Sequence, residues 1–125
     1  MKQNKSTFVI GQWAEKIAAD YLTDKGYEIL YTNWRAERGD IDIIARHHSF
    51  LVFVEVKGGS SEIYGPPELR ITEAKKRQVY KLASIFLAQN EDSDLVDEDH
   101  RFDVVVVDGT ENKFTIRHYE NAFSN

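Results

Sequence analysis

Residues 50–57, which read FLVFVEVK, are the feature that most limits how this chain can fold. The run is apolar on both faces until Glu55, which is typical of a central strand covered on both sides of a sheet. Alternate residues of a strand share a face, so Glu55 and Lys57 point the same way as Phe53. The run therefore predicts a layered α/β domain with one acid and one amine at the end of its central strand.

The other elements are predicted from helical spacing, alternation and turn residues. Helices are expected at residues 8–25, begun by Thr7 and ended by Gly26, and from Thr72 to about Asn90, with Val79, Leu82, Ala83 and Phe86 buried. Strands are expected at 27–35, 39–46, 50–57, 102–108 and 113–119, with a loop at 58–67. This order, α-β-β-β-α-β-β, predicts the α/β class, with a mixed central sheet flanked by helices.

Composition and length fit one globular domain over residues 1–125, with 42% hydrophobic and 30% charged residues. The net charge of −5 is concentrated in residues 91–100, which we expect to be a mobile acidic loop, so the rest of the chain is close to neutral. Charge thus neither indicates nor excludes a nucleic-acid partner. The absence of cysteine and of long apolar runs favours a cytoplasmic protein with no membrane association.

Asp42 becomes informative once the register of the hairpin is considered. A turn between His48 and Ser49 places Asp42 directly opposite Glu55 on the neighbouring strand. Opposed side chains lie on one face, with their Cβ atoms about 5 Å apart. Two carboxylates this close repel each other, and a divalent cation between them removes the repulsion. Asp40 shares this face as a spare acid.

Oxygen ligands in a chain without cysteine favour Mg²⁺ or Mn²⁺ over zinc. Such an ion binds a phosphate oxygen and lowers the pKa of a bound water, while Lys57 would orient that water or stabilise charge on the phosphate. Glu15, which borders the small residues of the first helix, would complete the metal site. The alternatives are a solvated Glu15 and a weak ion pair between Glu55 and Lys57 at a strand end.

Several motifs recur in a characteristic order: GQWAE at 11–15, GY at 26–27, NWR at 33–35, GDIDIIA at 39–45, FVEVK at 53–57, RFDVV at 101–105 and NAF at 121–123. Asp42 followed by Glu55-Val56-Lys57 resembles the PD-(D/E)xK nuclease signature. The whole pattern resembles the YraN-like family of uncharacterised bacterial proteins, which is itself similar to archaeal Holliday-junction resolvases.

This resemblance implies a restriction-endonuclease-like core in which Glu15, Asp42 and Glu55 match the acidic metal ligands. Lys57 matches the catalytic lysine, and the carbonyl of Val56 matches a backbone metal ligand. The resolvase relatives pair as dimers, so the resemblance also implies a homodimer as the assembly to test.

The chain departs from the family pattern at three positions. Ala14 replaces a usual glycine, Asp40 a usual glutamate, and Gly59 an arginine that often follows the lysine. The last change removes a candidate phosphate contact.

Polar residues of the second helix are the candidates for contacting nucleic acid. Lys75 lies on the apolar stripe near the start of this helix, and Gln78 is the other residue that would face the site. Arg77 and Lys81 point outward, toward backbone phosphates or simply toward solvent. The alternative for Lys75 is a role without function, in which its apolar stem lies along the core and its amine reaches water.

Three functions fit these observations. The first is a metal-dependent endonuclease acting on DNA more than RNA, on branched or single-stranded forms. The second is a non-catalytic nucleic-acid-binding module whose nuclease site has decayed. The third is a protein-interaction domain that binds no nucleic acid, which the acidic net charge permits.

Overall fold

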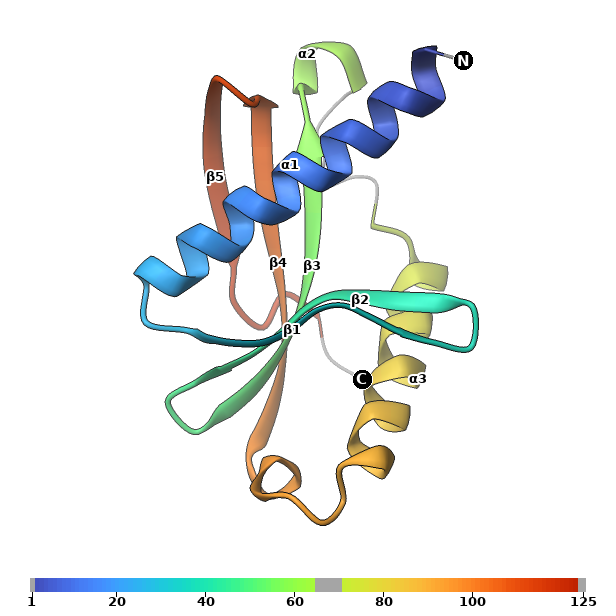
Figure 1. Cartoon of the computed structure of the whole chain (residues 1–125), viewed down its shortest axis with the longest axis vertical. Helices are drawn as coiled ribbons and strands as arrows, with labels where there is room; N and C mark the ends of the chain where they lie inside the picture. The colour runs from blue at the N-terminus through green and yellow to red at the C-terminus, as the bar shows by residue number, and fades with distance from the viewer. Residues whose placement is uncertain (1, 65–70, 124–125) are drawn as a thin grey trace.

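A five-stranded sheet in the order β1-β2-β3-β4-β5 forms the centre of the molecule (Figure 1). The structure is a computed structural model that describes residues 2–64 and 71–123, with side chains described for 11–62 and 71–123. The strands are β1 (Glu28–Ala36), β2 (Gly39–His47), β3 (Phe50–Gly59), β4 (Asp99–Thr110) and β5 (Lys113–Tyr119). The helices are α1 (Lys2–Asp24), α2 (Ser61–Tyr64), α3 (Glu73–Gln89) and the short 3-10 helix η2 (Asp94–Asp97). The mixed α/β class and the order α-β-β-β-α-β-β are confirmed.

Strand β3 occupies the middle of the sheet, between β2 and β4. It pairs antiparallel with β2 and parallel with β4, while the two outer pairs are antiparallel. A parallel pair needs a long crossover, which α3 supplies between β3 and β4. The apolar run at residues 50–57 therefore lies where its sequence predicts, covered on both faces.

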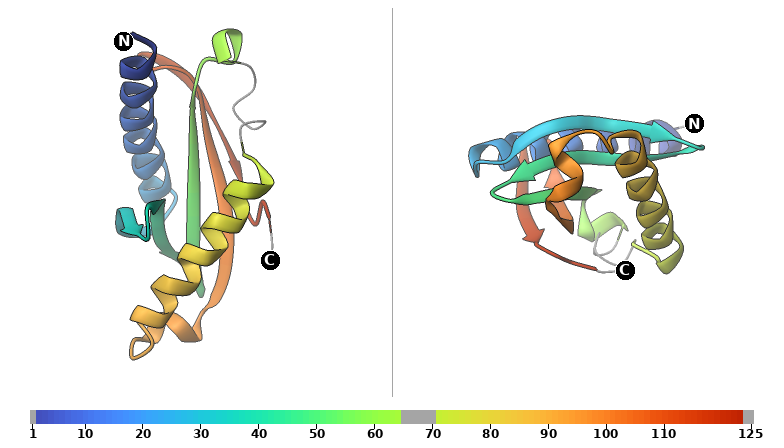
Figure 2. Two further views of the ribbon diagram at one scale, coloured as in Figure 1. Left: turned by 90° about the vertical axis from the view of Figure 1, so that its right-hand side faces the viewer. Right: turned by 90° about the horizontal axis from the view of Figure 1, so that it is seen from below.

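Helices α1 and α3 pack on opposite faces of the sheet (Figure 2). Leu22 of α1 lies in one buried cluster with Val52 and Val54 of β3. Phe86 of α3 lies in a second cluster with Phe53. Phe53 lies between Val52 and Val54 on β3, so its side chain points to the opposite face of the sheet. The alternation of β3 thus assigns Glu55, two residues after Phe53, to the α3 face.

Both long helices end or begin with a recognisable cap. At the end of α1, the Tyr27 N–H donates to the Leu22 carbonyl at 2.9 Å and the Gly26 N–H to the Thr23 carbonyl at 3.0 Å, with Gly26 at φ 93°. This is a Schellman motif, which requires a left-handed residue that glycine supplies at low cost. At α3, the Thr72 side chain accepts from the Lys75 N–H, as predicted.

Some predicted boundaries are wrong. Helix α1 begins at Lys2, so Thr7 lies inside it and does not cap it. The expected loop at 58–67 begins with the end of β3 and continues into α2, and residues 65–67 lie outside the described residues.

The acidic segment at 91–100 is also more regular than predicted. It contains η2, and β4 begins within it at Asp99 because the parallel ladder continues to the pair Phe50–Asp99. Glu98 accepts two hydrogen bonds from Arg46 Nε, at 3.1 and 2.9 Å. No helix in the described part of the chain combines the length and apolarity needed to cross a bilayer.

Candidate functional site

The β2–β3 hairpin turns at His48 and Ser49, as predicted, and has the predicted register. Ile43 pairs with Val54, and each following pair keeps that alignment. The described ladder begins at this pair, and Figure 1 shows the earlier part of β2 turning away from the later part of β3. The predicted opposition of Asp42 and Glu55 therefore falls at the point where the two strands diverge.

Asp42 remains attached to β3 through its side chain. Its Oδ2 accepts a 2.8 Å hydrogen bond from the Val56 backbone N–H, and only 9% of the residue is exposed. Burial raises the pKa of Asp42 above its ordinary value, although the Val56 N–H and the nearby Lys75 and Lys57 oppose this shift. Asp42 is thus a buried carboxyl beside the backbone of the residue that follows Glu55.

Glu55 lies in the same buried environment. Its side chain is 1% exposed, and its Oε2 lies 3.6 Å from Lys75 Nζ. Lys75 Nζ also donates to Gln78 Oε1 at 3.2 Å. Burial, and next the negative charge of Asp42, raise the pKa of Glu55 to about 8, against the opposing effect of Lys75 and Lys57. A carboxyl with this pKa exchanges its proton near neutral pH.

Glu15 reaches the same cluster from α1. Burial, followed by the charge of Asp42, raises the pKa of Glu15 to about 7, while a hydrogen bond from the Asn33 side chain lowers it. Asp42 is therefore close enough to Glu15 for the two carboxyls to repel each other when both are ionised, and a proton or a cation between them would remove this repulsion.

Lys57 and Asp40 complete the cluster electrostatically. Lys57 is half-buried and lowers the pKa of both Asp42 and Glu55, so its amine lies close to both acids. Asp40 raises the pKa of those two acids and of Glu15, and therefore adds a fourth negative group. Four acids and two lysines from β2, β3, α1 and α3 thus lie close together where β2 turns away from β3.

The present arrangement is not a preformed metal cage. Within the part of the chain that the structure describes, no three His, Cys, Asp or Glu side chains are placed to hold a metal ion together. The hydrogen bond from Val56 occupies one oxygen of Asp42, and Lys75 occupies one oxygen of Glu55.

One buried atom nevertheless fits a metal site. Glu55 Oε1 is buried and has no hydrogen-bond partner; of the described side chains, only His47 has another such atom, its Nδ1. An unpaired buried carboxylate oxygen is costly unless a proton or a cation compensates it. The donor set, made of carboxylates with a nearby backbone carbonyl, suits Mg²⁺ or Mn²⁺.

Other predicted residues lie outside this cluster. Arg77 is exposed on α3. His47, at the end of β2, stacks on Tyr27 with ring centroids 3.9 Å apart. Trp34 packs edge-on against the Phe86 ring of the core, with ring centroids 5.3 Å apart.

Asn33 is a functional candidate that the motif reasoning did not single out. It occupies a left-handed conformation, φ 51°, within β1, and its side chain reaches Glu15. Asparagine is depleted in strands and enriched among left-handed residues, which is the sequence signal that marks this position.

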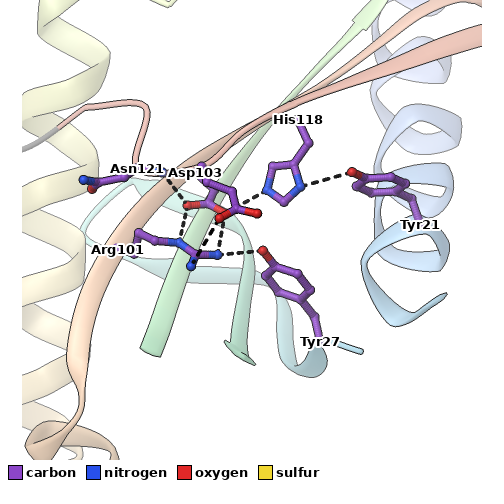
Figure 3. Close-up of polar contacts among 7 residues, drawn as sticks. Tyr21, Tyr27, Arg101, Asp103, His118 and Asn121 are labelled. Carbon is purple, nitrogen blue, oxygen red and sulfur yellow. Dashed lines mark hydrogen bonds and ion pairs between the residues drawn. The ribbon is translucent and has the colours of Figure 1, made fainter. Parts of the chain in front are cut away.

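A second buried carboxylate, Asp103, lies on the other face of the sheet (Figure 3). It accepts hydrogen bonds from Arg101 Nε at 2.9 Å, Arg101 Nη2 at 3.0 Å and the Asn121 N–H at 3.0 Å, and it contacts His118 Nε2 at 2.8 Å. Tyr21 OH contacts His118 Nδ1 at 3.2 Å. Because all of these partners lie inside the fold, Asp103 has a structural role.

Comparison with known proteins gives one consistent family. The profile described as "Uncharacterised protein family UPF0102" matches residues 14–107. A UPF0102 protein of Thermodesulfovibrio yellowstonii is 40% identical over 91% of this chain and 95% of its own length. UPF0102 proteins of Sulfurihydrogenibium and Geobacter metallireducens are 42% and 41% identical, over 91% and 96% of this chain and 93% of each relative.

Proposed function

The chain belongs to the UPF0102 family of uncharacterised proteins, and we propose that it is a metal-dependent nuclease that hydrolyses phosphodiester bonds, in DNA more than in RNA. The observation that carries this proposal is the convergence of Glu15, Asp42 and Glu55 with Lys57 around an unpaired buried oxygen. Structural ion pairs alone do not require three neighbouring carboxyls whose pKa values are all raised.

Asp42, Glu55 and Glu15 would hold a Mg²⁺ or Mn²⁺ ion, with the Val56 carbonyl as a backbone ligand. When bound, such an ion supplies Lewis acidity toward a phosphate oxygen and lowers the pKa of a water. Loading requires the carboxyls to lose their protons and Lys75 to leave Glu55 Oε2, so we expect metal affinity to rise with pH through neutrality.

Lys57 and Lys75 are the groups that act on the substrate. Lys57 lies on the same strand and face as Glu55, so its amine would donate to the scissile phosphate and stabilise the negative charge that develops there. Lys75, once released from Glu55, would neutralise the same phosphate, with Gln78 holding its amine. Water attacking in line with the leaving oxygen forms a new P–O bond as the old one breaks; the attacking water loses a proton to solvent, and the leaving oxygen takes one up from solvent.

Incubation of the purified chain with labelled DNA and RNA tests the proposal. The panel contains single strands, duplexes and four-way junctions, with Mg²⁺, Mn²⁺ or EDTA. We expect cleavage of DNA only with a divalent ion, and its loss in Glu55→Gln and Lys57→Ala. Lys16→Ala is the matched control, because Lys16 is exposed on α1 and pairs with the exposed Asp20. Cleavage that survives both site substitutions would refute the proposal.

The second candidate is a module that binds nucleic acid without cleaving it. Two internal contacts favour this function: the Val56 N–H donates to Asp42, and Lys75 pairs with Glu55. These contacts compensate part of the negative charge of the site without a metal ion. Titration calorimetry with Mn²⁺ separates the two functions. Heat of binding that disappears in Asp42→Asn supports the nuclease, and its absence at millimolar Mn²⁺ supports the module.

A further inference from the structure

Tyr119 lies in line with Glu55 across the sheet. Strand pairing places Val104 of β4 beside Glu55 and Tyr119 of β5 beside Val104. Paired residues present their side chains on the same face, and adjacent strands lie about 4.8 Å apart. The backbones of Glu55 and Tyr119 are therefore separated by roughly 10 Å, two strand spacings.

This row of residues faces the α3 side of the sheet. Val104 packs with Val79 of α3, whereas His118, the neighbour of Tyr119, points to α1. Figure 1 shows α3 on the β2 side of the sheet, away from β5. Tyr119 thus lies on the same face as Val104, on the edge strand β5, and it is 40% exposed.

A cavity of about 370 Å³ lies over this row and is lined by Ile71, Lys76, Val104, Tyr119, Ala122 and Phe123. Val104 forms its apolar floor directly beside Glu55. The Ala122 N–H donates to the Phe102 carbonyl at 2.7 Å, and this bond holds the C-terminal wall in place. The cavity therefore begins one strand away from the acidic cluster.

Lys76 places a positive charge at this cavity. Its Nζ lies 5.8 Å from the centre of the Phe123 ring and 3.1 Å from Glu73 Oε2. Glu73 is exposed, so water screens this pair and a phosphate can compete for the amine. A tyrosine ring, an apolar floor and an adjacent amine match the base and phosphate of one nucleotide.

We propose that this cavity binds one unpaired nucleobase, stacked on Tyr119, next to the bond that is cleaved. This inference rests on the proposed nuclease function and narrows its substrate to nucleic acid that is single-stranded beside the scissile phosphate. A base within a duplex has both faces covered by its neighbours, so it must leave the helix before it can stack on a protein ring.

Binding measured in EDTA tests the subsite separately from cleavage. The probe is a fluorescent oligothymidylate of about 12 nucleotides, within the span of known single-strand sites, followed by anisotropy at low ionic strength. We expect Tyr119→Ala to weaken binding about 5- to 150-fold, the range that one base stack supplies, and Tyr119→Phe to retain it. Phe114→Ala is the matched control, because Phe114 is 38% exposed on the same strand but faces the opposite side of the sheet.

A second probe distinguishes stacking from attraction to phosphates. An abasic chain of the same length keeps every phosphate but has no base, so it should bind wild type and Tyr119→Ala equally. A thermal unfolding curve for each variant shows whether it is folded, and Tyr119→Phe keeps the test valid if Tyr119→Ala unfolds.

The outcomes separate this inference from the function on which it rests. Base-dependent binding that requires the ring of residue 119, with no cleavage in Mn²⁺, would retain the subsite and refute the nuclease. Metal-dependent cleavage combined with equal oligothymidylate binding by wild type and Tyr119→Ala would overturn the subsite. Absence of oligothymidylate binding by wild type, or equal binding of the abasic chain, would also overturn it.

Discussion

Lys75 Nζ lies 3.6 Å from Glu55 Oε2, whereas the other oxygen of the same carboxylate has no hydrogen-bond partner. One lysine, itself a quarter exposed, therefore compensates only part of a charge that is almost fully buried. Because burial disfavours the charge of ionised Glu55 and Lys75 compensates only part of it, the pKa of Glu55 is raised to about 8. Glu55 therefore keeps its proton into the neutral pH range. The charge of the candidate site consequently changes over the pH range in which the protein would work.

We predict that the metal-free protein loses stability as pH rises from about 4.5 to about 8. The pKa of Glu55 is raised from 4.5 to about 8 in the folded state, so the folded chain binds more protons than the unfolded chain in this window. The free energy of unfolding then falls with rising pH until Glu55 is ionised in both states. Urea denaturation at several pH values in EDTA measures this slope.

The variant Glu55→Gln should flatten this dependence. It removes the buried charge, so we expect its Tm at pH 8 to exceed that of wild type by roughly 5 °C, the shift that about 1 kcal/mol produces in a small domain. Part of the slope remains, because the pKa values of Glu15 and Asp42 are also raised. An unchanged slope in Glu55→Gln would show that Glu55 is not the titrating group.

We predict that Mn²⁺ raises the Tm more at pH 8 than at pH 6. Protons compete with the ion for the carboxylates, and an ion that binds only the folded state stabilises it by about 2.7 kcal/mol at 100 times its dissociation constant. Differential scanning fluorimetry at both pH values measures the shift. Asp42→Asn should abolish it, and Asp20→Asn, an exposed acid of α1, should leave it intact.

Lys75→Met should destabilise the metal-free protein in a pH-dependent way. At pH 9 Glu55 is ionised and loses its ion-pair partner, which we expect to cost about 1 kcal/mol after solvent screening of a partly exposed lysine. At pH 6 Glu55 is protonated, so the cost should be close to zero. Urea denaturation of Lys75→Met and of the control Lys76→Met decides this, and an equal loss at both pH values would contradict the ion pair.

Asp103→Asn should lower the free energy of unfolding by about 3 kcal/mol at pH 7, because it removes the buried carboxylate of Arg101 and leaves only the more distant, exposed Glu120 as its ion-pair partner. Burial raises the pKa of Asp103, but hydrogen bonds from His118, Arg101 and the Asn121 N–H hold it below its ordinary value of 3.8. The stabilisation is therefore present above pH 3.8 and is lost as pH falls through the lower folded value.

Urea denaturation of Asp103→Asn against wild type measures this loss. The exposed Asp99, near the start of the same strand, supplies the control variant Asp99→Asn, which should unfold like wild type. A loss below 1 kcal/mol in Asp103→Asn would indicate that water reaches Arg101 and replaces the carboxylate.

The elements with strong periodicity could be predicted from the sequence. The run at residues 50–57 predicts β3 because an apolar pattern on both faces fits a buried strand and little else. The N-terminal turns of α1 could not be predicted, because residues 2–7 are polar and carry no apolar phase. The start of β4 at Asp99 could not be predicted for a related reason. The backbone of Asp99 pairs with Phe50, but an acidic side chain gives no sign that its residue belongs to a strand.

The candidate site was predicted through its hairpin register. A two-residue turn and alternation suffice to bring Asp42 next to Glu55, and the register of Ile43 with Val54 agrees with that argument. The alternation of side chains along a strand does not show where the pairing of two strands ends. The sequence therefore carries no signal for the divergence of β2 and β3, or for the hydrogen bond from the Val56 N–H to Asp42. The contact from Asn33 depends on a local backbone reversal within β1, which motif spacing does not reveal.

The network around Asp103 joins parts of the chain that are far apart in sequence. It reaches Tyr21 near the end of α1 through His118, Tyr27 before β1 through Arg101, and the backbone of Asn121 after β5. Opening of the last turns of α1 or of β5 must therefore break bonds of this one network. The last turns of α1 and the edge strand β5 should consequently open as one cooperative unit, and their amide protons should exchange with similar opening free energies.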